Sequence, residues 1–339
     1  MQRIGNLYPQ FCSFENLLLA YRKARRGTRS NLETAAFFHQ MEPELLALQA
    51  ELASGVWQPQ PYRYFEIYDP KQRTISVAAF RDRVVHHALV NVLEPIFERR
   101  FIFDSYATRK GKGVHAAVAR AQHFLRSNGW FFKTDVEKYF DSIDHGILLG
   151  LLQRKIKDRQ LLEVCEKIVR NGGAVRQGLG LPIGNLTSQF FANVYLDPLD
   201  HFVADGGAGG FGSLAYLRYM DDFVIFSENK EHLKCWRPSI EIFLAERLAL
   251  QLKPSATFLN SRENGLSFLG RRIFPATVRL HPQHLRRITS RLARREKSFL
   301  VGEITEETFV QSSDSYWAML AFHPTLPLRR ALAHRPSKF

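Results

Sequence analysis

Two neighbouring aspartates stand where a small protein hairpin would ordinarily keep a neutral turn. Asp221 and Asp222 lie inside segment 216–226, whose other members are mostly apolar. The pattern predicts a β-hairpin that presents the acids at its turn, although surface hairpins favour Asn-Gly or Asp-Gly there. Two like charges at an apolar tip repel each other, and a bound cation would relieve that repulsion. We therefore interpret the pair as metal ligands, with a solvated turn as the alternative.

A third aspartate completes this set. Asp135 ends a short apolar run, which predicts a buried strand with a carboxylate at its end. Asp141 and Asp144 follow, where they suit a turn and the N-cap of a helix that begins near residue 145. Phosphoryl transfer uses two Mg²⁺ ions about 4 Å apart, and Mg²⁺ prefers carboxylate oxygens. The sequence therefore predicts a two-magnesium centre on Asp135 and the hairpin pair.

The elements that must hold these residues follow from the hydrophobic periodicity. Short strands are expected within 54–80 and at 130–132, 256–260 and 266–274, with a hairpin over 214–227. Helices are expected at 13–26, 31–53, 81–98, 113–127, 185–203 and 231–248, as a pair within 145–170, and from 282 onward. This mixture of separate helices and antiparallel strands indicates an α+β fold.

The charge balance points to a polyanionic partner. Lys and Arg number 47 against 33 Asp and Glu, giving a net charge of +14. Nucleic acid and an anionic membrane would both attract such a chain, but no apolar run is long enough to span a bilayer. We therefore expect nucleic acid and no membrane. Cys12, Cys165 and Cys235 are far apart without metal-binding spacing, so we expect three buried thiols and a cytoplasmic location.

Two segments resemble polymerase motifs of reverse transcriptases. The segment from Tyr219 to Asp222 is similar to motif C of that family, and the segment from Asp135 to Phe140 is similar to motif A. The resemblance implies an RNA-directed DNA polymerase with catalytic Asp135, Asp221 and Asp222. It also implies that Val136 joins these aspartates in binding two Mg²⁺ ions, for which Mn²⁺ can substitute.

The same resemblance implies a right-hand polymerase fold with fingers, palm and thumb. We expect an N-terminal helical extension at 1–60 and fingers at 61–130. The palm, an antiparallel sheet with helices, should cover 131–275 with a finger insertion at about 145–185. A helical thumb should follow at 276–339.

Further motifs imply contacts with deoxynucleotides. Arg73 and Arg83 are similar to finger residues that hold the incoming triphosphate, and Lys253 to a lysine near the leaving pyrophosphate. Phe140 matches the aromatic residue that excludes a 2′-hydroxyl. From the residues alone, the three basic side chains could equally be solvated surface charges.

The segment 268–270 resembles the primer grip, through Phe268, Leu269 and Gly270, although Phe268 and Leu269 could also be core residues. Beyond it, Arg287, Arg291 and Arg294 share one face of a predicted helix. This face either tracks the phosphates of template and primer or is simply solvated.

The loop 177–189 resembles motif B of reverse transcriptases from diversity-generating retroelements, with Ile183-Gly184 and Ser188-Gln189. That resemblance implies template-repeat RNA, an RNA/cDNA duplex, errors at template adenines and a small basic accessory protein that forms a barrel. Gly184 would let the backbone approach the nascent base pair without a side chain. Ile183 offers no hydrogen bond, so it should weaken discrimination against mispairs; loop packing is its alternative role.

Other functions remain open. A retron or phage-defence reverse transcriptase would keep the chemistry and change the biology. A catalytically silent RNA-binding protein of polymerase fold is disfavoured by the three intact aspartates. A group II intron maturase is disfavoured because little sequence follows the predicted thumb.

Overall fold

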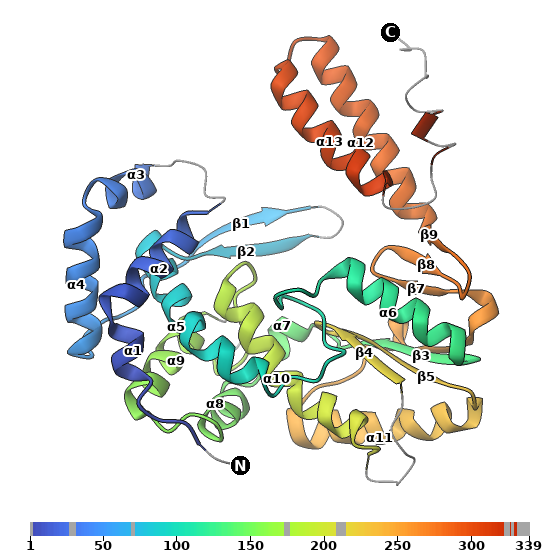
Figure 1. Ribbon diagram of the computed structural model, residues 1–339, viewed down its shortest axis with the longest axis horizontal. Coiled ribbons are helices and arrows are strands. Elements are labelled where there is room, and N and C mark those ends of the chain that lie inside the picture. Colours follow the sequence, from blue (N-terminus) through green and yellow to red (C-terminus); the bar gives the residue numbers. More distant parts are fainter. Residues whose placement is uncertain are drawn as a thin grey trace.

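The computed structural model describes residues 3–26, 32–68, 72–172, 177–207, 215–321, 326 and 329–330. Within these ranges, helices alternate with short antiparallel sheets, which confirms the predicted α+β class. Figure 1 shows helices of the N-terminal part on one side, a helix-covered sheet on the other, and a C-terminal helix pair standing apart from both.

The largest sheet of the described residues has four antiparallel strands in the order β4-β5-β3-β6. Their bounds are Trp130–Asp135 for β3, Ala215–Tyr219 for β4, Asp222–Ser227 for β5 and Phe258–Ser261 for β6. Because side chains alternate along a strand, Phe131 and Phe132 enter different cores. Burial of each ring contributes about 1.5–3 kcal/mol. Both faces of β3 are thereby fixed, and the strand expected before Asp135 is confirmed.

Helices cover both faces of this sheet. Phe131 packs with residues of α6 (Val114–Ser127), and Phe132 belongs to the core that includes α10 (Leu186–Ala204) and α11 (Lys230–Leu248). These helices match the spans expected from the sequence to within a few residues.

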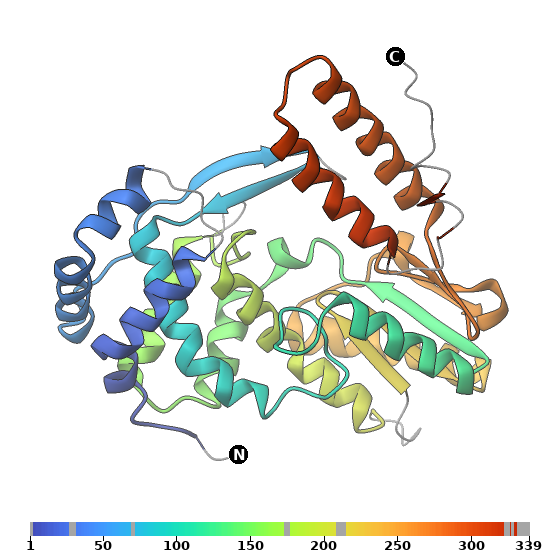
Figure 2. The same ribbon diagram turned by 45° about the horizontal axis from the view of Figure 1, so that its top comes forward.

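An N-terminal helical layer lies beside the sheet (Figure 1). It contains α1 (Tyr8–Cys12), α2 (Phe14–Arg25), α3 (Leu32–His39), α4 (Met41–Ala53) and α5 (Phe80–Glu98). Leu17, Leu45 and Leu89 are fully buried between these helices. From this layer the hairpin of β1 (Arg63–Ile67) and β2 (Arg73–Val77) extends in the direction of the C-terminal helices (Figure 2).

The single helix expected over 31–53 is wrong. The chain breaks at Gln40, which has φ −116° and ψ 33° and separates α3 from α4. In a continuous helix, the ring of Pro43 would clash with the carbonyl of His39. In α4, Pro43 lies in the first turn instead, where no backbone N–H needs a partner.

A short helical segment follows β3. It comprises α7 (Tyr139–Ser142), α8 (His145–Gln153) and α9 (Arg159–Asn171). Asp144 caps α8, since its Oδ1 accepts the backbone N–H of Ile147 at 2.9 Å. The N-cap role expected for Asp144 is therefore confirmed, and this aspartate is committed to the helix.

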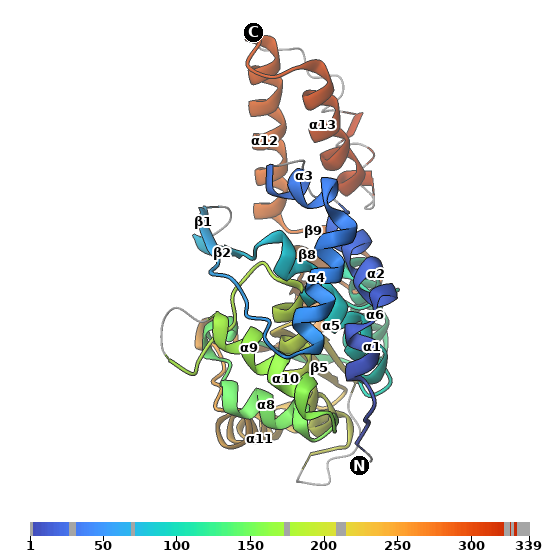
Figure 3. The ribbon, with the colours of Figure 1, turned by 90° about the vertical axis from the view of Figure 1, so that its left-hand side faces the viewer.

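The C-terminal part contains a three-stranded sheet followed by two helices. The sheet joins β7 (Leu266–Phe268), β8 (Arg271–Ile273) and β9 (Val278–Leu280), and the helices are α12 (Pro282–Leu300) and α13 (Glu306–Ala321). Leu280, Ile288 and Leu320 form a separate small core there. Figure 3 shows α12 and α13 at the opposite end of the molecule from α8 and α11.

One cysteine expectation is wrong. Cys12 and Cys165 are buried, but Cys235 is exposed. Residue 235 falls outside the buried stripe of α11, which comprises Leu233, Trp236, Ile240, Leu244 and Leu248. No helix among the described residues has the length and hydropathy needed to cross a membrane.

Candidate active site

The strand register brings the three predicted catalytic aspartates to one end of the main sheet. Asp135 on β3 lies directly opposite Asp222 on β5. Asp221 occupies the β4–β5 turn beside Met220, whose φ of 59° is in the left-handed region that a non-glycine residue adopts only in a constrained turn. Directly paired residues of antiparallel strands point to the same face of the sheet, with Cβ atoms about 4.5–5.5 Å apart. The carboxylates therefore converge.

Burial and mutual repulsion disfavour the negative charges at this end. Burial, followed by the charge of Asp135, raises the pKa of Asp221 to about 7. Burial also raises the pKa of Asp222 to about 6, although Lys133 acts against this shift. Oδ1 of Asp135 is buried without a hydrogen-bond partner among the described residues. A divalent cation would supply the missing positive charge, so this donor set fits one.

The third carboxylate is turned toward a lysine. Nζ of Lys133 lies 2.8 Å from Oδ1 of Asp222, at ion-pair distance although without hydrogen-bond geometry. Accordingly, no group of three His, Cys, Asp or Glu side chains in the described ranges forms a complete metal-binding cluster. Asp135 and Asp221 are thus the two carboxylates best placed to share an ion.

The backbone beside Asp135 is fixed by a distant segment. Val136 forms an antiparallel bridge with Leu252, in which Lys253 N–H donates to the carbonyl of Asp135 at 2.8 Å and Glu137 N–H donates to that of Gln251 at 2.9 Å. Since backbone groups alternate in direction along an extended strand, the carbonyl of Val136 points away from this bridge. Lys253, a predicted nucleotide contact, is thereby held next to Asp135.

Phe140 and the motif B loop are joined by backbone hydrogen bonds. Leu181 N–H donates to the carbonyl of Phe140 at 2.7 Å, and Gly180 N–H donates to that of Ile143 at 2.8 Å. The ring of Phe140 is half-buried, with its centroid 5.6 Å from that of Tyr139. The predicted steric gate is therefore held by the motif B loop, five residues after Asp135.

The following residues of the loop contact β2. Ser76 N–H donates to the carbonyl of Ile183 at 2.8 Å, and the amide of Asn185 donates to the carbonyl of Ser76 at 3.2 Å. Gly184 has φ +115°, and a Cβ there would lie 2.8 Å from Cγ2 of Ile75 and 3.0 Å from the carbonyl oxygen of Ser76. The close approach of β2 therefore requires a glycine here, and the expected approach to a base pair stays a prediction.

Arg83 lies near this contact and Arg73 does not. A cavity of about 450 Å³ between β2, α5 and the start of α10 is lined by Arg83, Gly184 and Gln189, together with His86. Burial lowers the pKa of His86 to about 3, so the positive charge in this cavity comes from Arg83. Its guanidinium donates to the carbonyl of Ala24 at 2.9 Å. Arg73 is exposed at the beginning of β2, outside the cavity lining.

The predicted primer grip forms the turn between β7 and β8. Phe268 is 2% exposed and packs in the core with Phe131, so its side chain anchors the turn to that core. Leu269 and Gly270 have φ values of 48° and 75°. The carbonyl of Gly270 accepts the N–H of His281 at 3.0 Å, which ties the turn to the beginning of α12.

Helix α12 is amphipathic, as expected, with arginines on its exposed face. Arg287 and Arg294 are exposed and Arg291 is half-buried, whereas Ile288 is buried against α13. These arginines lie remote from the aspartates in sequence and belong to the separate C-terminal helix pair. Their predicted contact with template and primer stays a prediction.

A buried arginine behind the catalytic turn was not expected from the sequence. Arg218 is fully buried, forms a bidentate ion pair with Asp200, and donates to the carbonyl of Met220 at 2.9 Å and to Asn193 Oδ1 at 3.1 Å. The hydroxyl of Tyr216 also donates to Asp200, at 2.8 Å. The network fixes the turn that carries Asp221. A charged residue at an inward-facing position of an apolar strand was the available sequence signal.

Known proteins share this fold and these segments. A family model described as "Reverse transcriptase (RNA-dependent DNA polymerase)" matches residues 68–273, more than half of the chain. Protein YkfC of Escherichia coli K12 is 28% identical over 273 residues, covering 68% of this chain and 71% of YkfC. The group II intron-encoded protein LtrA of Lactococcus lactis is 30% identical over 170 residues, covering 48% of this chain and 28% of LtrA.

Among solved structures, apo telomerase from Candida tropicalis superposes with a TM-score of 0.52 at 13% identity, covering 69% of this chain and 52% of the telomerase chain. At that identity the likeness shows the fold alone. It agrees with the right-hand polymerase architecture that the described sheets and helices form. The chain belongs to the reverse transcriptase family and is an RNA-directed DNA polymerase.

Proposed function

We propose that this reverse transcriptase serves a diversity-generating retroelement, copying a template-repeat RNA into cDNA with errors concentrated at template adenines. The observation that carries the proposal is Ile183, an apolar residue in the loop that contacts β2 and is joined to Phe140 through the motif B backbone. Gln189, the second feature of the resemblance, lines the same cavity as Gly184.

The aspartates of the main sheet would carry the chemistry. Asp135 and Asp221, with the carbonyl of Val136, would hold two Mg²⁺ ions, and Asp222 would complete the set. When bound, the ions neutralise charge on the attacking and leaving oxygens of an in-line displacement. The family as a whole uses divalent metals, and the buried Oδ1 of Asp135, which has no hydrogen-bond partner among the described residues, supports the same use.

The chain's own residues would orient the deoxynucleotide. Arg83, at the cavity beside Gly184, would hold the triphosphate, and Arg73 would reach it from the exposed start of β2. Phe140 would exclude a ribose, since its half-buried ring is held by the loop. Lys253 would lie near the leaving pyrophosphate, because its backbone is bonded to Asp135.

The subdomains of the polymerase would contact different parts of the bound nucleic acid. We propose fingers at 61–130, a palm at 131–275 and a thumb at 276–339, with an N-terminal extension before them. The turn with Leu269 and Gly270 would contact the primer, with Phe268 supporting it. Arg287, Arg291 and Arg294 would follow the phosphates of template and primer. A small basic accessory protein and a cytoplasmic location complete the proposal.

Low fidelity would follow from the absence of one hydrogen bond. The carbonyl of Ile183 is already used by Ser76, and its side chain can neither donate nor accept a hydrogen bond. Shape and stacking would then oppose a mispair at this position without help from an amide. One hydrogen bond has a net value of about 1 kcal/mol, which corresponds to roughly fivefold in discrimination.

The test is deep sequencing of cDNA made on one defined RNA template. We expect wild-type errors mainly at adenines, and we expect Ile183→Gln to lower them roughly fivefold. Ile183→Val is the matched control, because it keeps an apolar β-branched side chain and should keep the error rate. Accurate copying by the wild type at adenines would overturn the retroelement proposal and leave the polymerase activity intact.

A second candidate is the reverse transcriptase of a group II intron. Its support is the alignment with LtrA, a protein of which this chain spans about a quarter, 28%. In that case the enzyme should copy accurately and should bind folded intron RNA more tightly than an unstructured RNA of equal length. A retron or phage-defence enzyme would also copy accurately but would lack that preference.

A further inference from the structure

A large concave site lies on the side of the molecule away from the C-terminal helices. A cavity of about 660 Å³ opens between α8, α10 and α11. Figures 1 and 3 place α8 and α11 at the far end from α12 and α13. None of the residues assigned above to metal, nucleotide or primer binding lines it. The site is thus separate from the polymerase centre.

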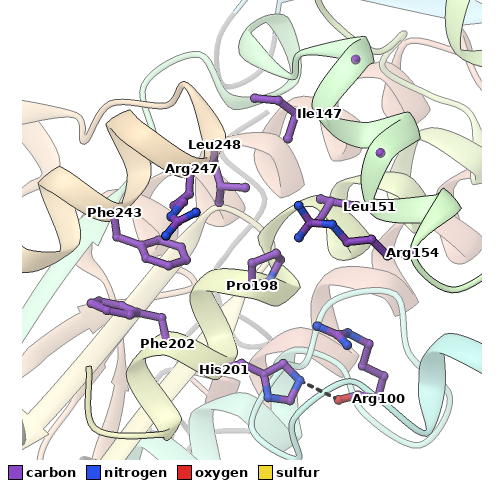
Figure 4. Close-up of a pocket in the computed structure, with 12 residues that line it drawn as sticks. Arg100, Ile147, Leu151, Arg154, Pro198, His201, Phe202, Phe243, Arg247 and Leu248 are labelled. Atoms are coloured by element: carbon purple, nitrogen blue, oxygen red, sulfur yellow. Dashed lines mark hydrogen bonds between the residues drawn. The ribbon is translucent and has the colours of Figure 1, made fainter. Parts of the chain in front are cut away.

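The walls of this cavity combine apolar and cationic side chains. Ile147, Leu151 and Phe202 contribute apolar surface, and the rings of Phe202 and Phe243 stack with centroids 4.3 Å apart. In Figure 4, Arg154 and Arg247 reach from opposite walls toward the space over Pro198. The lining contains no carboxylate, amide or hydroxyl side chain among the described residues.

The positive charge of the site is not neutralised. Arg154 and Arg247 are exposed and take part in no ion pair within the part of the chain that the structure describes. Arg100 and His201 share one buried carboxylate, that of Asp197, with His201 Nε2 3.4 Å from Asp197 Oδ1. The lining therefore offers cations and apolar surface to an occupant that must be anionic and apolar together.

Two glycines of α8 leave part of the cavity wall without side chains. Gly146 and Gly150 lie one turn apart on α8, and both line the cavity. Gly146 has a local reason, because a Cβ there would lie 3.2 Å from the capping Oδ1 of Asp144. A Cβ at Gly150 would meet no atom within 4 Å. Glycine destabilises a helix interior relative to alanine, so the fold gives no reason of its own for Gly150.

The shape favours a peptide over a nucleic acid. A second cavity of about 180 Å³ adjoins the first and shares Arg100, Leu151, Arg154 and Pro198 with it. Phe97 and Val194 add apolar surface there, and its one carboxylate, Asp197, is paired with Arg100. Two adjoining cavities can take two side chains of one segment. A splayed base needs hydrogen-bond acceptors as well as donors along its edge, and here the arginine side chains supply donors only. The stacked rings of Phe202 and Phe243 leave no gap for a base between them.

We propose that this cavity binds an acidic segment of a partner protein, with aromatic or branched aliphatic side chains as anchors and adjacent carboxylates on Arg154 and Arg247. The occupant cannot be a strongly basic protein, so it differs from the basic accessory protein proposed above. Charged pairs of this kind give specificity and association rate, while the apolar anchors supply most of the affinity.

The test selects peptides from a displayed random library on the full chain, with template and primer RNA present in excess to occupy other basic surfaces. We expect enriched peptides to combine Asp or Glu with Phe, Trp or Leu. Gly150→Leu, which fills the floor, and the double substitution Arg154→Glu with Arg247→Glu should each weaken their binding on the order of tenfold or more.

Matched controls separate this site from general effects of charge. Arg159→Glu with Arg237→Glu makes the same change in net charge on exposed helix positions and should leave peptide binding unchanged. All variants should retain primer extension and melting temperature. Enrichment of neutral or basic peptides, or peptide binding that ignores both cavity variants, would overturn the proposal. Loss of RNA binding in the cavity variants alone would identify a nucleic acid as the occupant and overturn it too.

Discussion

Asp221 occupies a position that opposes its own charge. Burial and the neighbouring Asp135 both raise its pKa, and the three aspartates are held in place by β3, β5 and the turn between β4 and β5. In the absence of metal such a carboxylate destabilises the fold, because a buried like-charge pair is unfavourable. Asp221 therefore serves the proposed metal binding but lowers the stability of the metal-free fold.

For Asp221→Asn we expect two effects of opposite sign. Magnesium-dependent primer extension on RNA should be abolished, whereas the free energy of unfolding in metal-free buffer should rise by about 1–2 kcal/mol, because one of two close charges is gone. Thermal melting with and without Mg²⁺ measures the second effect, and the wild type alone should be stabilised by the ion. Asp135→Asn should also abolish extension. A lower melting temperature for metal-free Asp221→Asn would contradict this account.

Phe140 gives a second prediction at this scale. Phe140→Ala should admit ribonucleotides, because removal of the half-buried ring opens space where a 2′-hydroxyl would lie. The measurement is the ratio of ribonucleotide to deoxynucleotide incorporation on one RNA template. Phe140→Tyr keeps the ring and serves as the control. An unchanged ratio in the alanine variant would show that Phe140 is a packing residue only.

At the scale of the elements, the hairpin that carries Asp221 is held by a buried ion pair. Replacing Arg218 by Met should lower the free energy of unfolding by about 3–5 kcal/mol, since Asp200 would keep a buried charge without its partner. It should also reduce kcat, because the carbonyl of Met220 loses its donor. Denaturant unfolding and extension assays measure the two effects.

A double variant tests whether the unpaired charge of Asp200 causes this loss of stability. Adding Asp200→Asn to Arg218→Met removes the unpaired charge and should recover most of the stability while leaving kcat low. Equal stability of the single and double variants would mean that the arginine acts through packing alone.

The sequence predicted the elements well wherever the pattern was local. The strand before Asp135, the hairpin around Asp221 and the cap at Asp144 all depend on neighbours within a few residues, and the structure has each of them. Pro43 marks the break at Gln40, whereas the leucine spacing behind the prediction of one helix, Leu45, Leu48 and Leu52, lies wholly within α4. Periodicity alone does not show where two helices of similar phase separate.

The sequence did not predict contacts between residues that are distant along the chain. Asp200 and Asn193 lie 18 and 25 residues from Arg218, and only the packing of α10 against β4 brings them together. The bridge between Val136 and Leu252 is more distant still. These contacts hold the backbone around the aspartates, so the three aspartates could be selected from local patterns, whereas the contacts that position them could not.

At the scale of the whole molecule, the C-terminal helices are a separate body with their own core. Leu280, Ile288 and Leu320 form it, and the N–H of His281, just before α12, donates to the carbonyl of Gly270 in the β7–β8 turn. The proposed contacts of Arg287, Arg291 and Arg294 require a ligand long enough to extend from this basic surface to the aspartates. This arrangement suits a duplex of template and primer.

The salt dependence of RNA binding tests this arrangement. Replacing Arg287, Arg291 and Arg294 together by Ala should reduce the slope of log Kd against log salt by about 2–3, close to one unit for each phosphate that no longer meets an arginine. Three exposed arginines in helical ion pairs provide the control: Arg159, Arg170 and Arg237. Equal slopes in the two triple variants would show that the face of α12 is merely solvated.

The close contact at Gly184 also limits how such an enzyme can evolve. A Cβ at position 184 would lie 2.8 Å from Cγ2 of Ile75 and 3.0 Å from the carbonyl oxygen of Ser76, so substitutions there separate β2 from the loop. Ile183 joins the same contact through its carbonyl, and a change of its side chain leaves that backbone hydrogen bond in place. Under the proposed role of Ile183 in fidelity, lineages that differ in copying accuracy should therefore differ at residue 183 and keep glycine at residue 184.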